Sequence, residues 1–384
     1  MDKYTEVIKT KTREDKLELT LVGNREYLYS GWEINQVMNR INNGYYKSEL
    51  INTIKSKLNL GIDPKNIYIM SESIKLNKTY SNVREGILNI SSEEGLLQFY
   101  YLGKPTPLLP NLKAYRIKYI FEIFEEIQSL ANTHGINAVN KKGGLFYLLN
   151  HLSEKPTEKE VKRDLKFLLY GSNEGEIKKD TKVASKIATL IDKPQKIYDK
   201  YTKILTMEEE ALLIEEDLIN EFQSIFNGYD KPVICIENDG GLIEILCIDM
   251  VAQNYFREMN SRFLETKQIK QNSPLLITIG ICLGFVPSIL KIRENFKDAS
   301  ETRRAIVDEY NQVENEVQRV QQEIDEQNKL LEAMEVINKT TVLPQNSNDE
   351  VRAAYERVEG MEKENEEKVA SILITRNISI DSIT

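Results

Sequence analysis

Taken alone, the sequence predicts an α+β protein that is mostly helical. Three patterns support this class: a period-two alternation near the N-terminus, a series of capped helical stripes after residue 111, and a long four-three spacing of apolar residues from residue 306. They predict a small α/β domain at residues 1–104, a helical domain at 105–291 with a short strand element near 233–237, a C-terminal coiled-coil helical hairpin arm at 292–370 and a tail at 371–384.

The N-terminal domain is predicted from strand and helix patterns that follow one another. Residues 17–21 alternate leucine with polar residues, which indicates a half-buried strand. Ser30 and Glu33 have the spacing of a capping box, so we expect a helix to begin there, and a second helix to end before Gly61. The aromatic-rich segment 97–102 is interpreted as a further strand.

The helical domain is predicted to begin after the segment 104–111, because its three prolines can continue neither a helix nor a central strand. Asn111 is expected to cap the first helix, whose apolar stripe continues to Ile127. Two apolar runs within residues 233–248 are compatible with either a hairpin or a strand followed by a helix. We favour the strand and helix, because helix-forming residues follow.

The C-terminal arm is predicted from a narrow apolar seam. Its members are Ile306, Tyr310, Val313, Val317, Val320, Ile324, Leu331 and Met334, with Gln327 at the remaining core-facing position. Polar residues flank them, so this helix has too little apolar surface for a globular core and too much to stand alone. A weaker seam after Pro344 is expected to fold back as an antiparallel hairpin. The hairpin either packs on its own domain or binds a second copy or another coiled-coil protein, and we favour binding.

Composition limits the functions that the chain can have. Its net charge of -9 and pI near 5.2 argue against coating nucleic acid by bulk charge. The three cysteines lack CxxC spacing and suit reduced thiols, and the first 16 residues lack the apolar core of a signal peptide, so we expect a cytoplasmic protein. The only two histidines, His134 and His151, are expected to be structural. No cofactor, catalytic residue or metal ligand is predicted.

A local basic stretch makes nucleic-acid binding the first alternative function. Its lysines recur at helical spacing beside two tyrosines, a combination that single-strand binders use to hold phosphates and stack bases. The candidate residues are Lys182, Lys186, Lys193, Lys196, Tyr198, Lys200, Tyr201 and Lys203. A solvated helix face whose tyrosines pack inward explains the same pattern.

Two further motifs have weaker support. Residues 141–144, Lys-Lys-Gly-Gly, lack the residue order of a phosphate-binding loop and are interpreted as a turn between helices. Asp249 with Glu265 and Lys267 loosely resembles the acidic and lysine residues of metal-dependent nucleases. Both acids are expected to lie on one helix, so this motif predicts no metal site.

The stretch Pro274–Leu290 contains 17 residues without a charge. This length is at the lower limit for crossing a hydrocarbon layer of about 30 Å, and Pro287 would kink a helix. A membrane-tethered scaffold is therefore the second alternative, although we favour a buried helix, or a strand followed by a helix, in the middle domain. The sequence predicts a non-enzymatic assembly or scaffold protein that acts through its C-terminal coiled coil.

Overall fold

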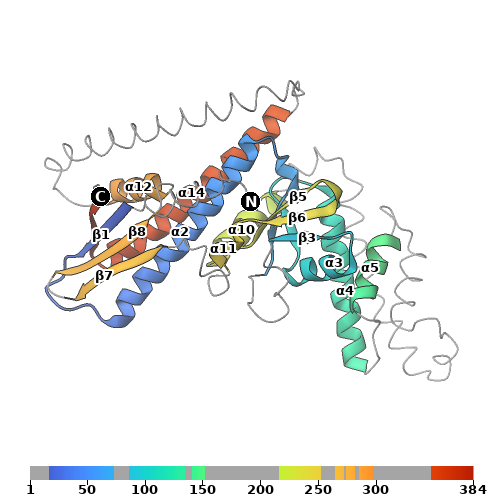
Figure 1. Cartoon of the computed structure of the whole chain (residues 1–384), viewed down its shortest axis with the longest axis horizontal. Helices are drawn as coiled ribbons and strands as arrows, with labels where there is room; N and C mark the ends of the chain where they lie inside the picture. Colours follow the sequence, from blue (N-terminus) through green and yellow to red (C-terminus); the bar gives the residue numbers. More distant parts are fainter. Residues whose placement is uncertain are drawn as a thin grey trace, which may run out of the picture. The chain divides into compact units, whose positions relative to one another are not determined.

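The computed structural model describes residues 17–72, 86–134, 141–151, 216–251, 264–271, 274–281, 285–297 and 347–383 (Figure 1). These residues are 59% helical and 23% strand. They form two compact units, and two long helices, α2 (Gly31–Asn59) and α14 (Ser347–Thr375), contribute residues to both. The first unit contains the described residues of 17–44, 264–297, 347–352 and 363–383, and the second contains those of 45–251 and 353–362.

A four-stranded antiparallel sheet forms the centre of the first unit. Its order is β7 (Glu265–Gln271), β8 (Leu275–Ile281), β1 (Leu17–Gly23) and β9 (Ile378–Ile383). Leu19 lies opposite Ile279 of β8, and Leu21 lies opposite Ile380 of β9. These side chains are buried, whereas the residues between them are partly exposed, so the predicted half-buried strand at 17–21 is confirmed.

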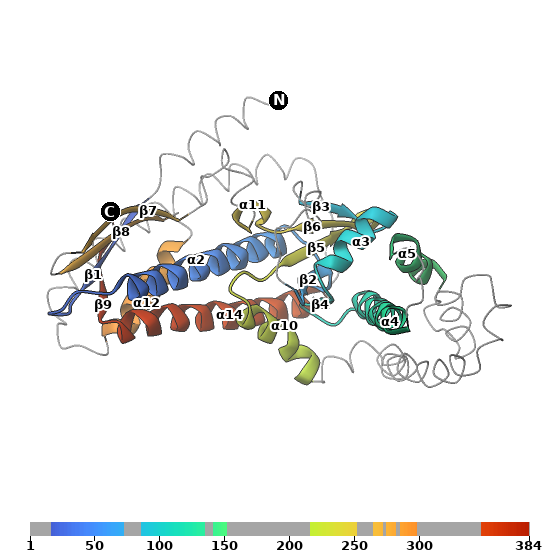
Figure 2. The same ribbon diagram turned by 90° about the horizontal axis from the view of Figure 1, so that it is seen from below.

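Helices α2, α12 (Val286–Lys297) and α14 bury apolar residues in the same unit. The ends of α14 and α2 that belong to this unit lie side by side (Figure 2) and approach closely at Gly44. A β-carbon at Gly44 would lie 2.4 Å from Cγ2 of Val369, and the amide of Asn365 donates a hydrogen bond of 3.0 Å to the carbonyl oxygen of Gly44. Glycine therefore allows the two helices to meet here.

A five-stranded antiparallel sheet forms the second unit. Its order is β3 (Ile87–Asn89), β6 (Leu242–Ile245), β5 (Ile234–Asn238), β2 (Ile67–Met70) and β4 (Pro105–Pro107). The proline-rich segment that was interpreted as an interdomain connection contains β4, which pairs with β2. Prolines are tolerated in an edge strand because its outer side needs no ladder hydrogen bonds. The interpretation excluded a central strand but missed this edge position.

The segment 233–248 forms a hairpin. Strands β5 and β6 pair around the turn η3 (Asp239–Gly241), in which Gly240 and Gly241 have φ angles of 75° and 77°. These angles favour glycine, so the turn follows from the sequence, and the preference for a strand followed by a helix is wrong. The interpretation of 97–102 as a strand is also wrong, because most of it belongs to α3 (Glu93–Tyr101), which Ser92 caps.

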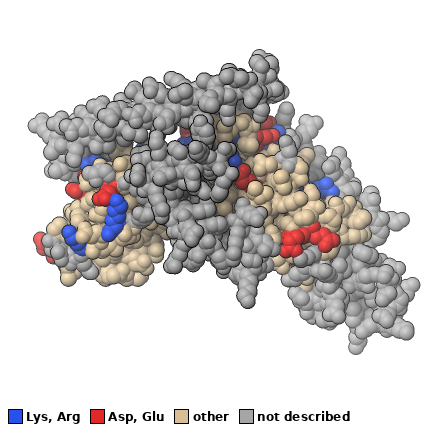
Figure 3. Space-filling view, viewed as in Figure 1, with Lys and Arg blue, Asp and Glu red and all other residues tan. Residues whose placement is uncertain are grey.

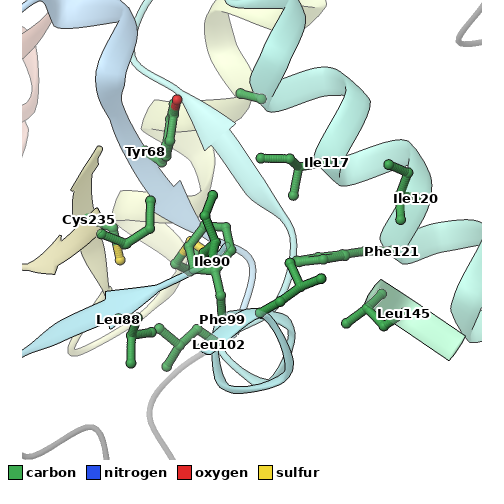
Figure 4. Close-up of a cluster of buried hydrophobic side chains, with 14 of the residues drawn as sticks. Tyr68, Leu88, Ile90, Phe99, Leu102, Ile117, Ile120, Phe121, Leu145 and Cys235 are labelled. Carbon is green, nitrogen blue, oxygen red and sulfur yellow. The ribbon is translucent and has the colours of Figure 1, made fainter. Parts of the chain in front are cut away.

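The core of the second unit lies between this sheet and the helices α3, α4 (Leu112–His134) and α5 (Lys141–His151) (Figure 4). Asn111 caps α4 as predicted, since its side-chain oxygen accepts hydrogen bonds from the backbone N–H groups of Lys113 and Ala114. Phe99 of α3 packs edge-on against Phe121 of α4 at 5.9 Å between ring centroids. Helix α10 (Glu216–Gly228) and the short elements η1 (Pro64–Asn66) and α11 (Ile248–Val251) complete the described part of this unit.

The predicted fold class, with an N-terminal α/β domain, a helical middle domain and a C-terminal coiled-coil hairpin, is wrong. The described residues form two antiparallel sheets, and they show no coiled-coil hairpin. The weaker C-terminal seam belongs to α14, where Val358 and Met361 are buried and Tyr355 donates a hydrogen bond of 3.0 Å to the carbonyl oxygen of Lys55 in α2. The partner of this helix is thus an N-terminal helix. The predicted domain boundaries themselves stay predictions.

Candidate functional site

Three large apolar side chains are exposed around the loop between β1 and α2. Tyr27, Leu28 and Trp32 have exposed fractions of 68, 64 and 63%, and Trp32 is the only tryptophan of the chain. We call these three residues the aromatic surface. Large apolar side chains that stand together in water are typical of binding surfaces. The residues that hold them decide whether this surface has a defined shape.

The loop is anchored by Tyr29, which is buried. Its hydroxyl group lies 2.9 Å from the carbonyl oxygens of Arg376 and Asn377, to which it donates its hydrogen. The ring packs against Gly23, where a β-carbon would lie 2.5 Å from the ring atom Cε2 of Tyr29. The backbone N–H of Asn24 also donates a hydrogen bond of 2.9 Å to the carbonyl oxygen of Asn377. The base of the aromatic surface is therefore fixed to the turn between α14 and β9.

Glu33 organises the charged groups beneath the aromatic surface. The predicted capping box is present, because Oε2 of Glu33 accepts a 3.0 Å hydrogen bond from the backbone N–H of Ser30, and the Ser30 hydroxyl accepts one of 3.2 Å from the N–H of Glu33. The other carboxylate oxygen accepts hydrogen bonds from Arg25 at 2.7 Å and from Arg376 at 3.1 Å. One carboxylate thus positions two guanidinium groups.

Both guanidinium groups stack on aromatic rings. Cζ of Arg25 lies 4.7 Å from the centroid of the Tyr29 ring and 5.4 Å from that of Tyr27, and Cζ of Arg376 lies 5.2 Å from that of Trp32. Cations at these distances are attracted to the ring face. The stacking restricts the rings of Tyr27 and Trp32 while leaving most of each ring in water.

The electrostatics of this cluster keep Glu33 ionised. The backbone N–H of Ser30, and then the hydrogen bond from Arg25, lower the pKa of the Glu33 carboxyl group to about 2. The same carboxylate raises the pKa of Arg25. The Glu33 carboxylate is therefore ionised throughout the neutral range, where it holds the guanidinium group of Arg25.

The composition of the site suits a protein partner. Tryptophan, tyrosine and arginine are the residues most enriched among those that dominate binding energy at protein interfaces. The side chains of Arg25 and Arg376 are only 12% and 19% exposed, and both contact Glu33. Binding of phosphate groups would require exposed cations, whereas these two mostly buried guanidinium groups stack on the rings of Tyr27 and Trp32 and hold them in place.

A second polar cluster lies inside the second unit. The Tyr68 hydroxyl donates a hydrogen bond of 2.6 Å to Oε2 of Glu237, and Lys113 forms an ion pair with the other carboxylate oxygen. Burial, and then the Glu237 carboxylate, raise the pKa of Tyr68. The amide of Asn111 donates to the carbonyl oxygen of Lys65 at 2.8 Å. Both oxygens of the buried Glu237 carboxylate have partners, so we infer that this cluster stabilises the fold rather than binding a ligand.

Most of the residues that the sequence singled out cannot be placed among the described residues. All residues of the seam from Ile306 to Met334, and all lysines and tyrosines of the nucleic-acid candidate at 182–203, lie outside the described residues. Residues 141–144 form the beginning of helix α5, so their interpretation as a turn is wrong. In the space-filling view, acidic and basic side chains are interspersed on the described surface that faces the viewer, without an extended basic area (Figure 3).

The remaining candidates are placed as follows. Asp249 lies in α11, whereas Glu265 and Lys267 lie in β7, and Lys267 forms an ion pair of 2.6 Å with Glu18. The expected shared helix for the two acids is wrong. His151 lies in the last turn of α5, with its ring centroid 4.2 Å from that of Tyr147. Within the described ranges, no group of three or more His, Cys, Asp or Glu side chains is arranged to hold a metal ion.

The apolar stretch Pro274–Leu290 contains strand β8 and the beginning of helix α12. Leu275, Ile277 and Ile279 of the strand and Ile289 of the helix are buried in the first unit. These residues belong to its core, as favoured, although the prediction placed the stretch in the middle domain. Among the helices of the described residues, none combines the length and the apolar character needed to cross a membrane.

The aromatic surface was missed by sequence reasoning. Its signal is present for Trp32, which falls outside the apolar stripe that begins at Ile34, because a tryptophan on the polar side of a helix is exposed. Comparison with protein families, with characterised proteins and with solved structures finds no match to this chain.

Proposed function

We propose that this chain is a non-enzymatic assembly protein that binds a protein partner through the aromatic surface of its first unit. The observation that carries this proposal is the combined exposure of Tyr27 and Leu28 in the loop before α2 and of Trp32 in its first turn, where Glu33 holds Arg25 and Arg376 in place. Surfaces that are rigid before binding lose little conformational entropy on binding, so aromatic residues on them contribute affinity efficiently.

The predicted coiled-coil seam is a second element of the same proposal. Its residues, from Ile306 to Met334, lie outside the described residues, so its support is the four-three spacing alone. Binding of nucleic acid through the lysines and tyrosines at 182–203 is the alternative outcome of the experiment below. The predicted cytoplasmic location stays a proposal as well.

Sedimentation of the full chain, alone and with a single-stranded oligonucleotide, tests the proposed function. We expect the wild-type chain to sediment above its monomer mass of 44.4 kDa without nucleic acid. A Tyr27→Ala/Trp32→Ala variant should sediment at a lower mass than the wild type, because it removes the aromatic surface. A Val317→Asp/Ile324→Asp variant should also sediment at a lower mass if the seam contributes to assembly.

A matched control is Leu60→Ala. Leu60 is as exposed as Tyr27, at 68%, but lies in the second unit, so its loss should leave the mass unchanged. A wild-type chain that remains at monomer mass alone and gains mass only with the oligonucleotide would overturn the assembly proposal. In that case, replacing Lys193, Lys196, Lys200 and Lys203 with glutamate should abolish the gain.

A further inference from the structure

We draw no further inference here: the strongest candidate, the exposed apolar pair of Ile87 on the edge strand β3 and Leu242 on its neighbour β6 in the second unit, lies on a sheet edge for which nothing in the described part of the structure shows what covers it.

Discussion

Replacing Gly44 with alanine tests the close contact between α2 and α14 in the first unit. The new β-carbon would lie 2.4 Å from Cγ2 of Val369, well inside the distance at which carbon atoms touch. Overpacking of this kind costs about 1–3 kcal/mol, and the higher helix propensity of alanine offsets about 0.5–1 kcal/mol of it. We therefore expect Gly44→Ala to lower the free energy of unfolding by about 0.5–2 kcal/mol.

The same helix pair provides a control and a rescue. Gly360 lies inside α14, and a β-carbon added there would meet nothing within 4 Å, so Gly360→Ala should raise stability by about 0.5–1 kcal/mol. Val369→Ala alone should cost about 2 kcal/mol through lost burial and a cavity. Combined with Gly44→Ala, it makes room for the new methyl group, so the double variant should be more stable than the sum of the two single effects by about 1–2 kcal/mol.

Urea unfolding followed by far-ultraviolet circular dichroism measures the wild type and all four variants. If Gly44→Ala stabilised the protein as much as Gly360→Ala, or if the effects of Gly44→Ala and Val369→Ala simply added, the two helices would not be in the contact described above. The reasoning from the β-carbon position would then be refuted.

Three further predictions concern other parts of the chain. Tyr68→Phe should lower the free energy of unfolding in urea by about 1–3 kcal/mol, because it leaves one oxygen of the buried Glu237 without its donor. Tyr27→Phe should have little effect, because the Tyr27 side chain is exposed. Equal effects would contradict a stabilising role for the Tyr68 cluster. Gly95→Ala should lower the thermal midpoint strongly, because its β-carbon would lie 2.0 Å from the carbonyl oxygen of Asn89, while Gly143→Ala, with open space around it, should not. Since the pKa of Glu33 is lowered to about 2 in the folded protein, its stabilising effect is complete above its unfolded pKa of about 4.3 and is lost as the pH falls toward 2. The difference in unfolding midpoint between the wild type and Glu33→Gln, followed by Trp32 fluorescence, should therefore shrink over that range, and a constant difference would show that Glu33 is not held by Arg25 and Ser30.

The features of the fold that could be predicted are those that depend on residues close together in the sequence. The alternation at 17–21, the capping box of Ser30 with Glu33 and the cap at Asn111 all appear in the structure, since each depends on groups a few residues apart. The stop before Gly61 is also present, although the two helices expected before it are one helix, α2. Helix boundaries inside a continuous apolar pattern are weak local signals.

Of the candidate site, only the capping box of Ser30 with Glu33 could be predicted from the sequence. The capping box indicated that Glu33 is held at the beginning of a helix, but its contact with Arg376 joins residues 343 positions apart. No local pattern identifies that partner, because an arginine after a helix normally suits solvent or the helix end. Without it, Trp32 is an isolated apolar residue rather than part of a fixed surface.

The sequence by itself determined where some of the helices and strands begin, such as β1, α2 and α4, through caps and the period of apolar residues. Tertiary structure alone decided what those elements contact: β1 pairs with β8 and with β9, more than 250 residues away, and α14 finds its partner in α2. The physical reason is that the pattern of an apolar stripe or a half-buried strand indicates only that one face must be buried, without identifying the element that covers it. Several elements in this chain could cover each face, and the choice among them depends on close packing, such as that at Gly44, which becomes defined only when the elements meet.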